Sequence, residues 1–201
     1  ALNCENNRDE RSRYLLVENR KVENYVDMAL YYARMDAVYK DYMIAETNLQ
    51  EVAQQVLLQN KYYLIQSHVK AEVACPDTVY SDKKWIAFIL NQLIQNSVKY
   101  GRSEGTHIQI VTKKTKSGVL LRVKDDGIGI PKEEIPRIFE KGFTGTNGRN
   151  RERSTGMGLY LCRKLCDKLN IEIRAESAEG KGTEIILMFP VSDYLTGYRE
   201  T

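Results

Sequence analysis

The chain has 201 residues, enough for one domain of ordinary size with an appendage, and 42% of them are hydrophobic and 28% charged. That balance is typical of a folded soluble domain rather than a disordered chain. The formal net charge of 30 − 27 = +3 is too small to indicate a nucleic acid or a membrane surface as partner. No apolar run approaches the ~20 residues of a membrane-spanning helix, and there is no signal peptide. The first residue is Ala1 rather than Met, so we expect a fragment of a longer protein.

The first forty residues predict one long helix. From Arg8 to Tyr39 the chain is charged and contains neither glycine nor proline. An apolar seam with heptad spacing runs along this segment and consists of Leu15, Val22, Val26, Ala29 and Ala33. Such a seam favours pairing with a second helix. Packing on the helix's own domain is the alternative, but few other segments could cover so long a seam.

A globular domain is predicted to follow. Residues 42–45 are a short strand candidate. Asn48 is expected to cap a helix, because Glu51 follows it with the spacing of a capping box. The alternating residues 68–75 predict a strand that ends at Pro76.

The remaining elements alternate in type. They are a helix from Ser81 or Asp82, strands at 106–114 and 119–124, a polar glycine-containing loop at 143–155, a helix at 157–169, and strands at 171–177 and 183–190. This order implies an α+β domain, a two-layer α/β sandwich whose mixed sheet is covered by helices on one face.

The first chemical signal lies on the helix that starts near Ser81. Gln92, Asn96 and Lys99 share one face of it, since positions i, i+4 and i+7 align. Amide oxygens are hard ligands suited to Mg²⁺, and lysine can hold phosphate oxygens. A solvated polar face is the alternative.

Two glycine-containing segments follow. The segment 125–131 comes directly after a strand, so the carboxylate of Asp125 can accept a hydrogen bond from an exocyclic amine. Its glycines let the backbone approach a flat ligand. The segment 154–159 enters a helix, where free amide N–H groups make an anion site. Either segment alone is an ordinary turn.

Other readings of the sequence are excluded or weaker. There is no GxxxxGK[ST] stretch, and Lys132 stands where a GxGxxG loop needs its third glycine. His68 and His107 lie in strand patterns without a nearby acidic or nucleophilic partner in sequence, which indicates structural or surface roles. Cys162 and Cys166 are expected to be buried thiols on one helix face rather than metal ligands.

In this order and spacing, the three motifs resemble the histidine kinase catalytic domain, within the superfamily of gyrase, heat-shock chaperone and mismatch-repair ATPases. The resemblance covers about residues 41–191. The matching boxes are residues 96–100 (N box), 125–130 (first glycine box), 138–140 with Phe143 (F box) and 154–159 (second glycine box). It implies the Bergerat ATP-binding fold and transfer of the ATP γ-phosphate to a protein histidine, for relay to a response-regulator aspartate.

The resemblance also implies ATP and Mg²⁺ as ligands. Asp125 would hold the adenine amine, Asn96 would bind Mg²⁺, Lys99 would approach the phosphates, and residues 141–155 would form a lid. The implied nucleotide-binding set is Asn96, Lys99, Tyr100, Asp125, Gly127, Gly129, Ile130, Lys141, Thr155, Gly156, Met157, Gly158, Leu159 and Thr183.

Residues 23–34, followed by Asp41 and Tyr42, resemble the second dimerisation helix of the bacitracin-type intramembrane-sensing kinases of Firmicutes. The resemblance implies a truncated dimerisation and histidine-phosphotransfer segment at 1–40 and a catalytic domain at 41–201. It further implies a homodimer in the full-length kinase, a cognate response regulator, a membrane or ABC-transporter-type sensing partner and no nucleic acid. The domain would be the cytoplasmic part of a membrane-anchored protein. No histidine lies in residues 1–40, so we do not expect the chain alone to phosphorylate itself.

Three residues depart from the family pattern. Asp126 replaces an asparagine, Ser154 replaces a glycine, and Gln92 replaces an asparagine at the start of the N box, so only Asn96 is assigned to the metal. Two alternatives remain: a degenerate ATP-binding module that relays conformation, and a serine kinase of the anti-sigma type, against which the helical seam argues. A chaperone-type ATPase is disfavoured, because Gln92 stands where its catalytic glutamate would be.

Overall fold

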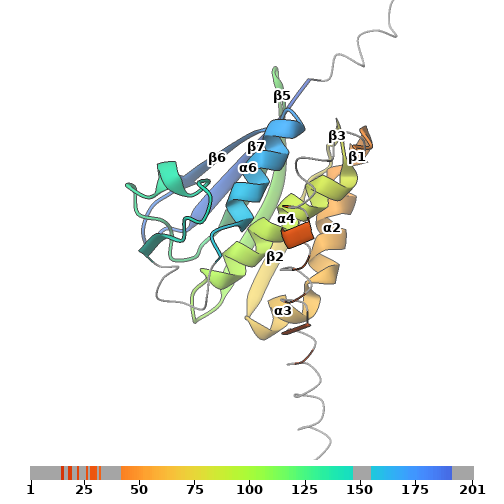
Figure 1. Ribbon diagram of the computed structural model, residues 1–201. Helices are drawn as coiled ribbons and strands as arrows, with labels where there is room; N and C mark the ends of the chain where they lie inside the picture. The colour runs from red at the N-terminus through yellow and green to blue at the C-terminus, as the bar shows by residue number, and fades with distance from the viewer. Residues whose placement is uncertain are drawn as a thin grey trace, which may run out of the picture.

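A computed structural model describes residues 42–146 and 155–191, together with single positions between 15 and 32 (15, 18, 19, 22, 26, 28–30 and 32). Within these ranges the chain forms a layer of helices against one face of a β-sheet (Figure 1). The elements are β1 (Ala45–Asn48), α2 (Leu49–Gln59), α3 (Lys61–Gln66), β2 (Val69–Ala74), β3 (Thr78–Ser81), α4 (Lys83–Lys99), β4 (Thr106–Thr115), β5 (Gly118–Asp125), the 3₁₀ turn η1 (Ile135–Arg137), α6 (Gly158–Lys168), β6 (Glu172–Ser177) and β7 (Thr183–Pro190).

The main sheet has five strands in the order β2-β4-β5-β7-β6. Strand β2 runs parallel to β4, and every other neighbouring pair in this sheet is antiparallel. Strands β1 and β3 pair separately as a two-stranded ribbon. The predicted mixed sheet, with helices on one face, is therefore confirmed.

Helix α4 lies at the centre of the helical layer and contacts both α2 and α6. The apolar residues predicted for it, Trp85, Phe88, Ile89, Leu93 and Ile94, are all buried. They pack in the core with inward residues of the sheet such as Ile110 and Leu121, so the removal of apolar surface from water holds the two layers together.

Helix α6 contributes the two predicted buried thiols. Cys162 and Cys166 are both fully buried, as expected from their shared helix face. Burial raises the pKa of the Cys166 thiol to about 12, and it raises the pKa of Cys162 as well. Both side chains therefore stay protonated and pack as small apolar groups.

Several local predictions were wrong. The strand expected at 42–45 begins only at Ala45, because its residues pair with β3, a four-residue strand that the sequence pattern did not reveal. Helix α3 was also missed. His68 does not lie in a strand: its φ of 53° places it in the turn before β2. The cap at Asn48 is confirmed, since its side chain accepts the backbone N–H of Glu51 at 3.1 Å.

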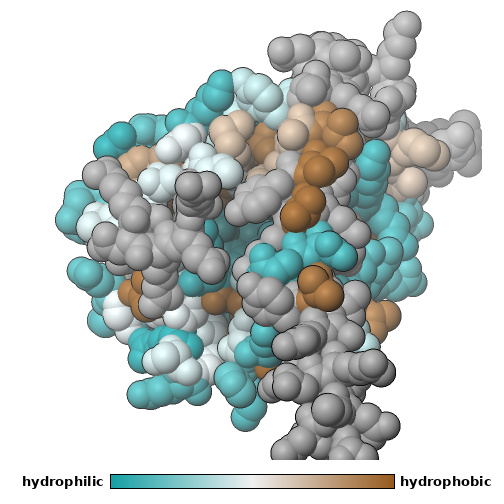
Figure 2. Space-filling model, turned by 60° about the horizontal axis from the view of Figure 1, so that its bottom comes forward, coloured by the Kyte–Doolittle hydropathy of each residue, from teal (hydrophilic) through white to brown (hydrophobic). Residues whose placement is uncertain are grey.

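Four of the five residues of the predicted N-terminal seam are described, and Ala33 lies outside the described residues. Ala29 is helical and exposed. Leu15, Val22 and Val26 are helical, and each is more than half exposed. Hydrophobic side chains on the face shown in Figure 2 lie among hydrophilic ones. Among the residues described, no helix has the length and apolarity needed to cross a membrane. Pairing of the seam with another helix stays a prediction.

The N-terminus of α4 offers a test of the fold. Asp82 is only 4% exposed, and its carboxylate accepts the N–H groups of Lys84 (2.9 Å), Trp85 (3.3 Å) and, from the start of the domain, Met43 (2.8 Å). We expect Asp82→Ala to lower the free energy of unfolding by about 2 kcal/mol or more, since it leaves buried donors without partners.

The matched control is Asn48→Ala at the exposed cap of α2, where a single hydrogen bond is lost. It should cost about 1 kcal/mol. Denaturant unfolding of both variants measures the difference, and equal losses would contradict the special role of Asp82.

Candidate functional site

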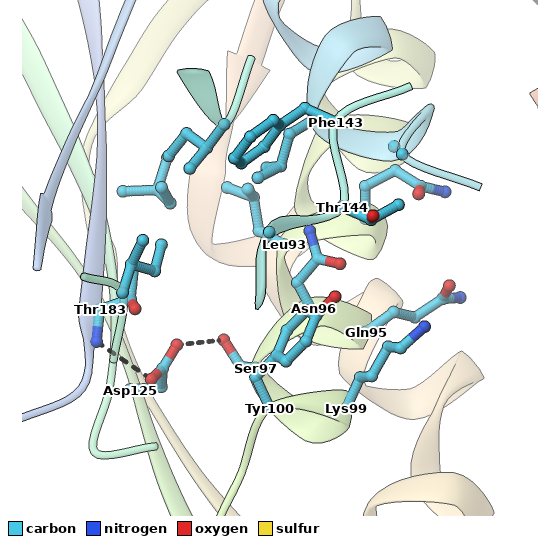
Figure 3. A pocket seen from close by; sticks show the side chains of 18 of the residues that line it. Leu93, Gln95, Asn96, Ser97, Lys99, Tyr100, Asp125, Phe143, Thr144 and Thr183 are labelled. Carbon is cyan, nitrogen blue, oxygen red and sulfur yellow. Dashed lines mark hydrogen bonds between the residues drawn. The ribbon is translucent and has the colours of Figure 1, made fainter. Parts of the chain in front are cut away.

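A cavity of about 250 Å³ opens between α4 and the ends of β5 and β7. Figure 3 shows the α4 side chains along one wall and Asp125 with Thr183 on the sheet side. Its remaining walls come from residues 129–131 and from the two described stretches on either side of residue 150, which contribute Phe143, Thr144, Gly145, Thr155, Gly156, Gly158 and Leu159.

Asp125 stands at the inner end of the cavity because β5 ends there, opposite Thr183 of β7. Its Oδ1 accepts the N–H groups of Gly127 (3.0 Å) and Thr183 (3.1 Å), and its Oδ2 accepts the hydroxyl of Ser97 (2.9 Å). Burial raises the pKa of this carboxyl above its ordinary value, and the three hydrogen bonds oppose that effect. The site thus holds a desolvated acceptor.

Apolar side chains flank this acceptor. Leu93 from α4, Val123 and Ile185 from the sheet, and Ile138 and Phe143 from the segment after the second motif all line the cavity. An apolar slot with one half-buried acceptor at its end suits a flat ring that carries an amine.

The other end of the cavity is polar. Gln92, Asn96 and Lys99 all line it, which confirms that they share one face of α4. Gln92 is 5% exposed, and its Nε2 is buried without a hydrogen-bond partner in the part of the chain described. The ammonium group of Lys99 at this end of the cavity fits an anionic group such as phosphate.

A metal would have few protein ligands here. The described residues contain no group of three histidine, cysteine, aspartate or glutamate side chains that could hold an ion. The amide oxygen of Asn96 faces the same cavity as Lys99. Such a donor set fits Mg²⁺, which keeps several waters and binds through one or two protein groups together with substrate phosphates.

Close backbone contacts close the cavity at two glycines. Gly129 has a φ of 71°, and a Cβ there would lie 2.0 Å from the carbonyl oxygen of Ala178. Gly156 has a φ of 65°, and a Cβ there would lie 2.3 Å from the carbonyl carbon of Gly142. The Gly142 N–H donates to the Gly156 carbonyl at 3.1 Å. Larger residues would strain both turns.

Every residue of the predicted nucleotide set lines the cavity except Gly127, Lys141 and Met157. Gly127 lies behind Asp125 and donates to it. Met157 precedes α6, and its N–H donates to Thr155 Oγ1 at 3.3 Å.

Lys141 is turned toward the N-terminal segment. Its Nζ lies 2.5 Å from the hydroxyl of Tyr32 and 4.7 Å from the centre of that ring. The hydrogen bond raises the pKa of Lys141. Met28 of the same segment lines the cavity, so residues that precede β1 contact the site.

The sequence interpretation missed other wall residues. Ser97 could have been found, because Leu93, Ser97 and Tyr100 share a helix face by the same i, i+4, i+7 rule. Glu134 carried no signal of its own. It accepts the N–H of Thr146 at 2.8 Å and also the hydroxyl of Thr146.

Comparison with known proteins defines the class. The family described as histidine kinase-, DNA gyrase B- and HSP90-like ATPase matches residues 81–193. The chain belongs to this ATPase family, and an adenine nucleotide is the ligand class that membership implies.

Two curated relatives are sensor kinases. The sensor histidine kinase YxdK of Bacillus subtilis (strain 168) is 34% identical over 174 residues, which are 86% of this chain and 54% of YxdK. The sensor protein kinase GraS of Staphylococcus aureus (strain JH1) is 36% identical over 189 residues, 92% of this chain and 53% of GraS. The chain therefore spans about half the length of the curated relatives it matches.

Solved structures agree with the fold. The nucleotide-free catalytic domain of the histidine kinase ThkA aligns with a TM-score of 0.63 at 26% identity, covering 74% of this chain and 97% of that domain. ThkA in complex with the response regulator TrrA aligns with a TM-score of 0.65 at 23% identity, covering 88% of this chain and 49% of the ThkA chain. The predicted resemblance to the histidine kinase catalytic domain is confirmed.

Partial burial of the Asp125 carboxylate has a consequence for stability. Because the pKa of Asp125 is higher in the folded than in the unfolded chain, its stabilising effect is present at low pH and is lost as the pH rises from about 4 through the folded-state pKa. We expect Asp125→Asn, which has no charge to bury, to be more stable than the wild type at neutral pH.

Thermal unfolding of both proteins from pH 4 to pH 8 tests this expectation. The stability advantage of Asp125→Asn should grow with pH and then level off. An advantage that does not change with pH would contradict the assigned burial of the charge.

Proposed function

We propose that this chain is the ATP-binding catalytic part of a two-component sensor histidine kinase, which transfers the γ-phosphate of ATP to a protein histidine. The observation that carries the proposal is the pairing of a half-buried acceptor, Asp125, at one end of an apolar slot with Asn96 and Lys99 at the other. An adenine ring and its phosphates have this same polarity. The names of the relatives support the direction of transfer.

In this proposal the apolar slot binds the nucleobase. Asp125 accepts the adenine amine, and Gly129, Ile130 and Thr183 line the same end of the cavity. The aliphatic walls exclude water from the ring, which strengthens the hydrogen bond to the carboxylate. Tyr100, which caps the C-terminus of α4, borders the ribose side.

The phosphates lie toward Lys99 and the N-terminus of α6. Residues Thr155–Leu159 lead into that helix, whose first amide groups can donate to anionic oxygens. Asn96 holds Mg²⁺, and a bound Mg²⁺ neutralises charge on the transferred phosphoryl group. Lys99 orients the phosphate oxygens. The proposed set is completed by a lid over the nucleotide that residues 141–155 form, and by Gly127, Gly156, Met157 and Gly158. Lys141 belongs to this lid.

The proposal also covers the full-length kinase to which this chain would belong. Residues 1–40 form the end of a dimerisation and histidine-phosphotransfer segment, and residues 41–201 form the catalytic domain. The full kinase is a homodimer anchored in the membrane, with this part in the cytoplasm and a membrane or ABC-transporter-type sensing partner. A response regulator receives the phosphoryl group, as the complex of ThkA with TrrA supports.

The adenine contact gives a quantitative test. Asp125→Asn replaces a charged acceptor by a neutral amide, and a hydrogen bond to a charged group contributes about 1.5–3 kcal/mol. We expect ATP affinity to fall about tenfold or more while the fold survives. Calorimetric titration with Mg²⁺–ATP measures it.

The matched control is Asp126→Asn, because the Asp126 carboxylate accepts the His107 N–H instead of lining the cavity. Its ATP affinity should equal that of the wild type. An Asp125→Asn protein with unchanged affinity would show that the nucleobase binds elsewhere.

Phosphotransfer tests the activity itself. With γ-labelled ATP, Mg²⁺ and the histidine-bearing dimerisation segment of a relative added as a separate protein, label should appear on the added histidine. None should remain on His68 or His107 of this chain. ATP binding without transfer would favour the degenerate signalling module, and label on serine would favour the anti-sigma type of kinase.

A further inference from the structure

Ser97 is the one side chain that the described structure places in a hydrogen bond with Asp125. Its hydroxyl donates to Oδ2 at 2.9 Å across the 28 residues that separate the two, from α4 to the end of β5 (Figure 3). Ser97 is 4% exposed, and the bond itself is part-buried at the wall of the cavity. A buried hydroxyl bound to a desolvated carboxylate is a strong, directional contact.

The two oxygens of Asp125 are not equivalent. Oδ1 has both of its in-plane acceptor positions occupied, by the N–H groups of Gly127 and Thr183. Oδ2 has one position occupied by Ser97 and retains one more. The remaining position is therefore the acceptor that a ligand amine can use, and Ser97 fixes its direction.

We infer that Ser97 is a positioning residue, which keeps the Asp125 carboxylate oriented and able only to accept hydrogen bonds. In this way Ser97 sets the preference of the site for a purine with a 6-amino group over a purine with a 6-oxo group. The inference rests on the proposed function, in which Asp125 meets the nucleobase. The 6-oxo oxygen of a purine is an acceptor like the carboxylate oxygen it would face. The two oxygens repel each other while the carboxylate is ionised and held by Ser97. A carboxyl that gains a proton becomes a donor and loses that discrimination.

Several titratable groups of the described residues lie near Asp125. Asp126, next in the chain, raises the pKa of Asp125. Lys99 at the end of α4, the capping residue Tyr100 and Glu134 just before η1 line the same cavity. His107 of β4 pairs with Glu72, and Glu184 of β7 pairs with Arg122 at 2.7 Å.

The test compares Mg²⁺–ATP with Mg²⁺–ITP, whose purine carries an oxygen in place of the amine. Ser97→Ala should weaken ATP binding about tenfold, the loss expected for one hydrogen bond to a charged group, and should leave ITP binding little changed. Ser97→Cys fills the same space with a weak donor and should shift the ratio in the same direction. The hydroxyl of Ser97 lowers the pKa of Asp125, so both substitutions should raise that pKa. As the pH is lowered, the ATP affinity of both variants should therefore start to fall at a higher pH than that of the wild type.

The matched control is Ser81→Ala. Ser81 is also a buried serine, and its hydroxyl has no hydrogen-bond partner within the described residues. It precedes α4, at the opposite end from Ser97, so both affinities should stay at wild-type values.

The outcomes separate cleanly. Equal weakening of ATP and ITP with an unchanged pH profile would assign Ser97 to packing alone and overturn the inference. Unchanged affinities in the Ser97 variants would overturn it too. A wild-type chain that does not bind ATP would instead contradict the proposed function.

Discussion

The antiparallel pairing of β5 with β7 is the constraint on which the site depends. It sets Asp125 opposite Thr183, so a backbone N–H from β7 reaches the carboxylate at the point where β5 ends. A slip of one residue in this register would turn Asp125 to the other face of the sheet, away from α4. The core residues Leu121, Val123 and Ile185 lie on the helix-covered face, so burial of the core and placement of the carboxylate enforce the same register.

The site contains polar groups whose removal from water lowers the stability of the fold. A carboxylate of raised pKa and the unpaired amide donor of Gln92 stand beside a tightly packed core. Each lowers the stability of the empty fold, because a desolvated polar group lacks the hydration it has in the unfolded chain. A ligand that supplies the missing partners recovers that energy on binding. The polar groups of the cavity are thus prepared for a ligand before it arrives, while the aliphatic core of α2, α4 and α6 provides the stability that tolerates them.

The sequence allowed prediction of the long elements and of the motifs, because each rests on local periodicity. The apolar face of α4, the cap at Asn48 and the shared face of Gln92, Asn96 and Lys99 all follow from helix geometry. Strand β3 and helix α3 escaped prediction because four and six residues are too short to show a period. Ser97 and Lys141 illustrate a different limit. Their partners, Asp125 and Tyr32, lie 28 and 109 residues away, and only tertiary structure brings such pairs together.

The hydrogen bond between the Gly142 N–H and the Gly156 carbonyl joins the two ends of the stretch between them. Each end of this bond is a glycine with a positive φ, so a residue with a Cβ at either position would strain its turn. One backbone hydrogen bond therefore links the segment after η1 to the segment before α6, and residues of both segments line the cavity. A substitution at either glycine would thus perturb two walls of the cavity at once.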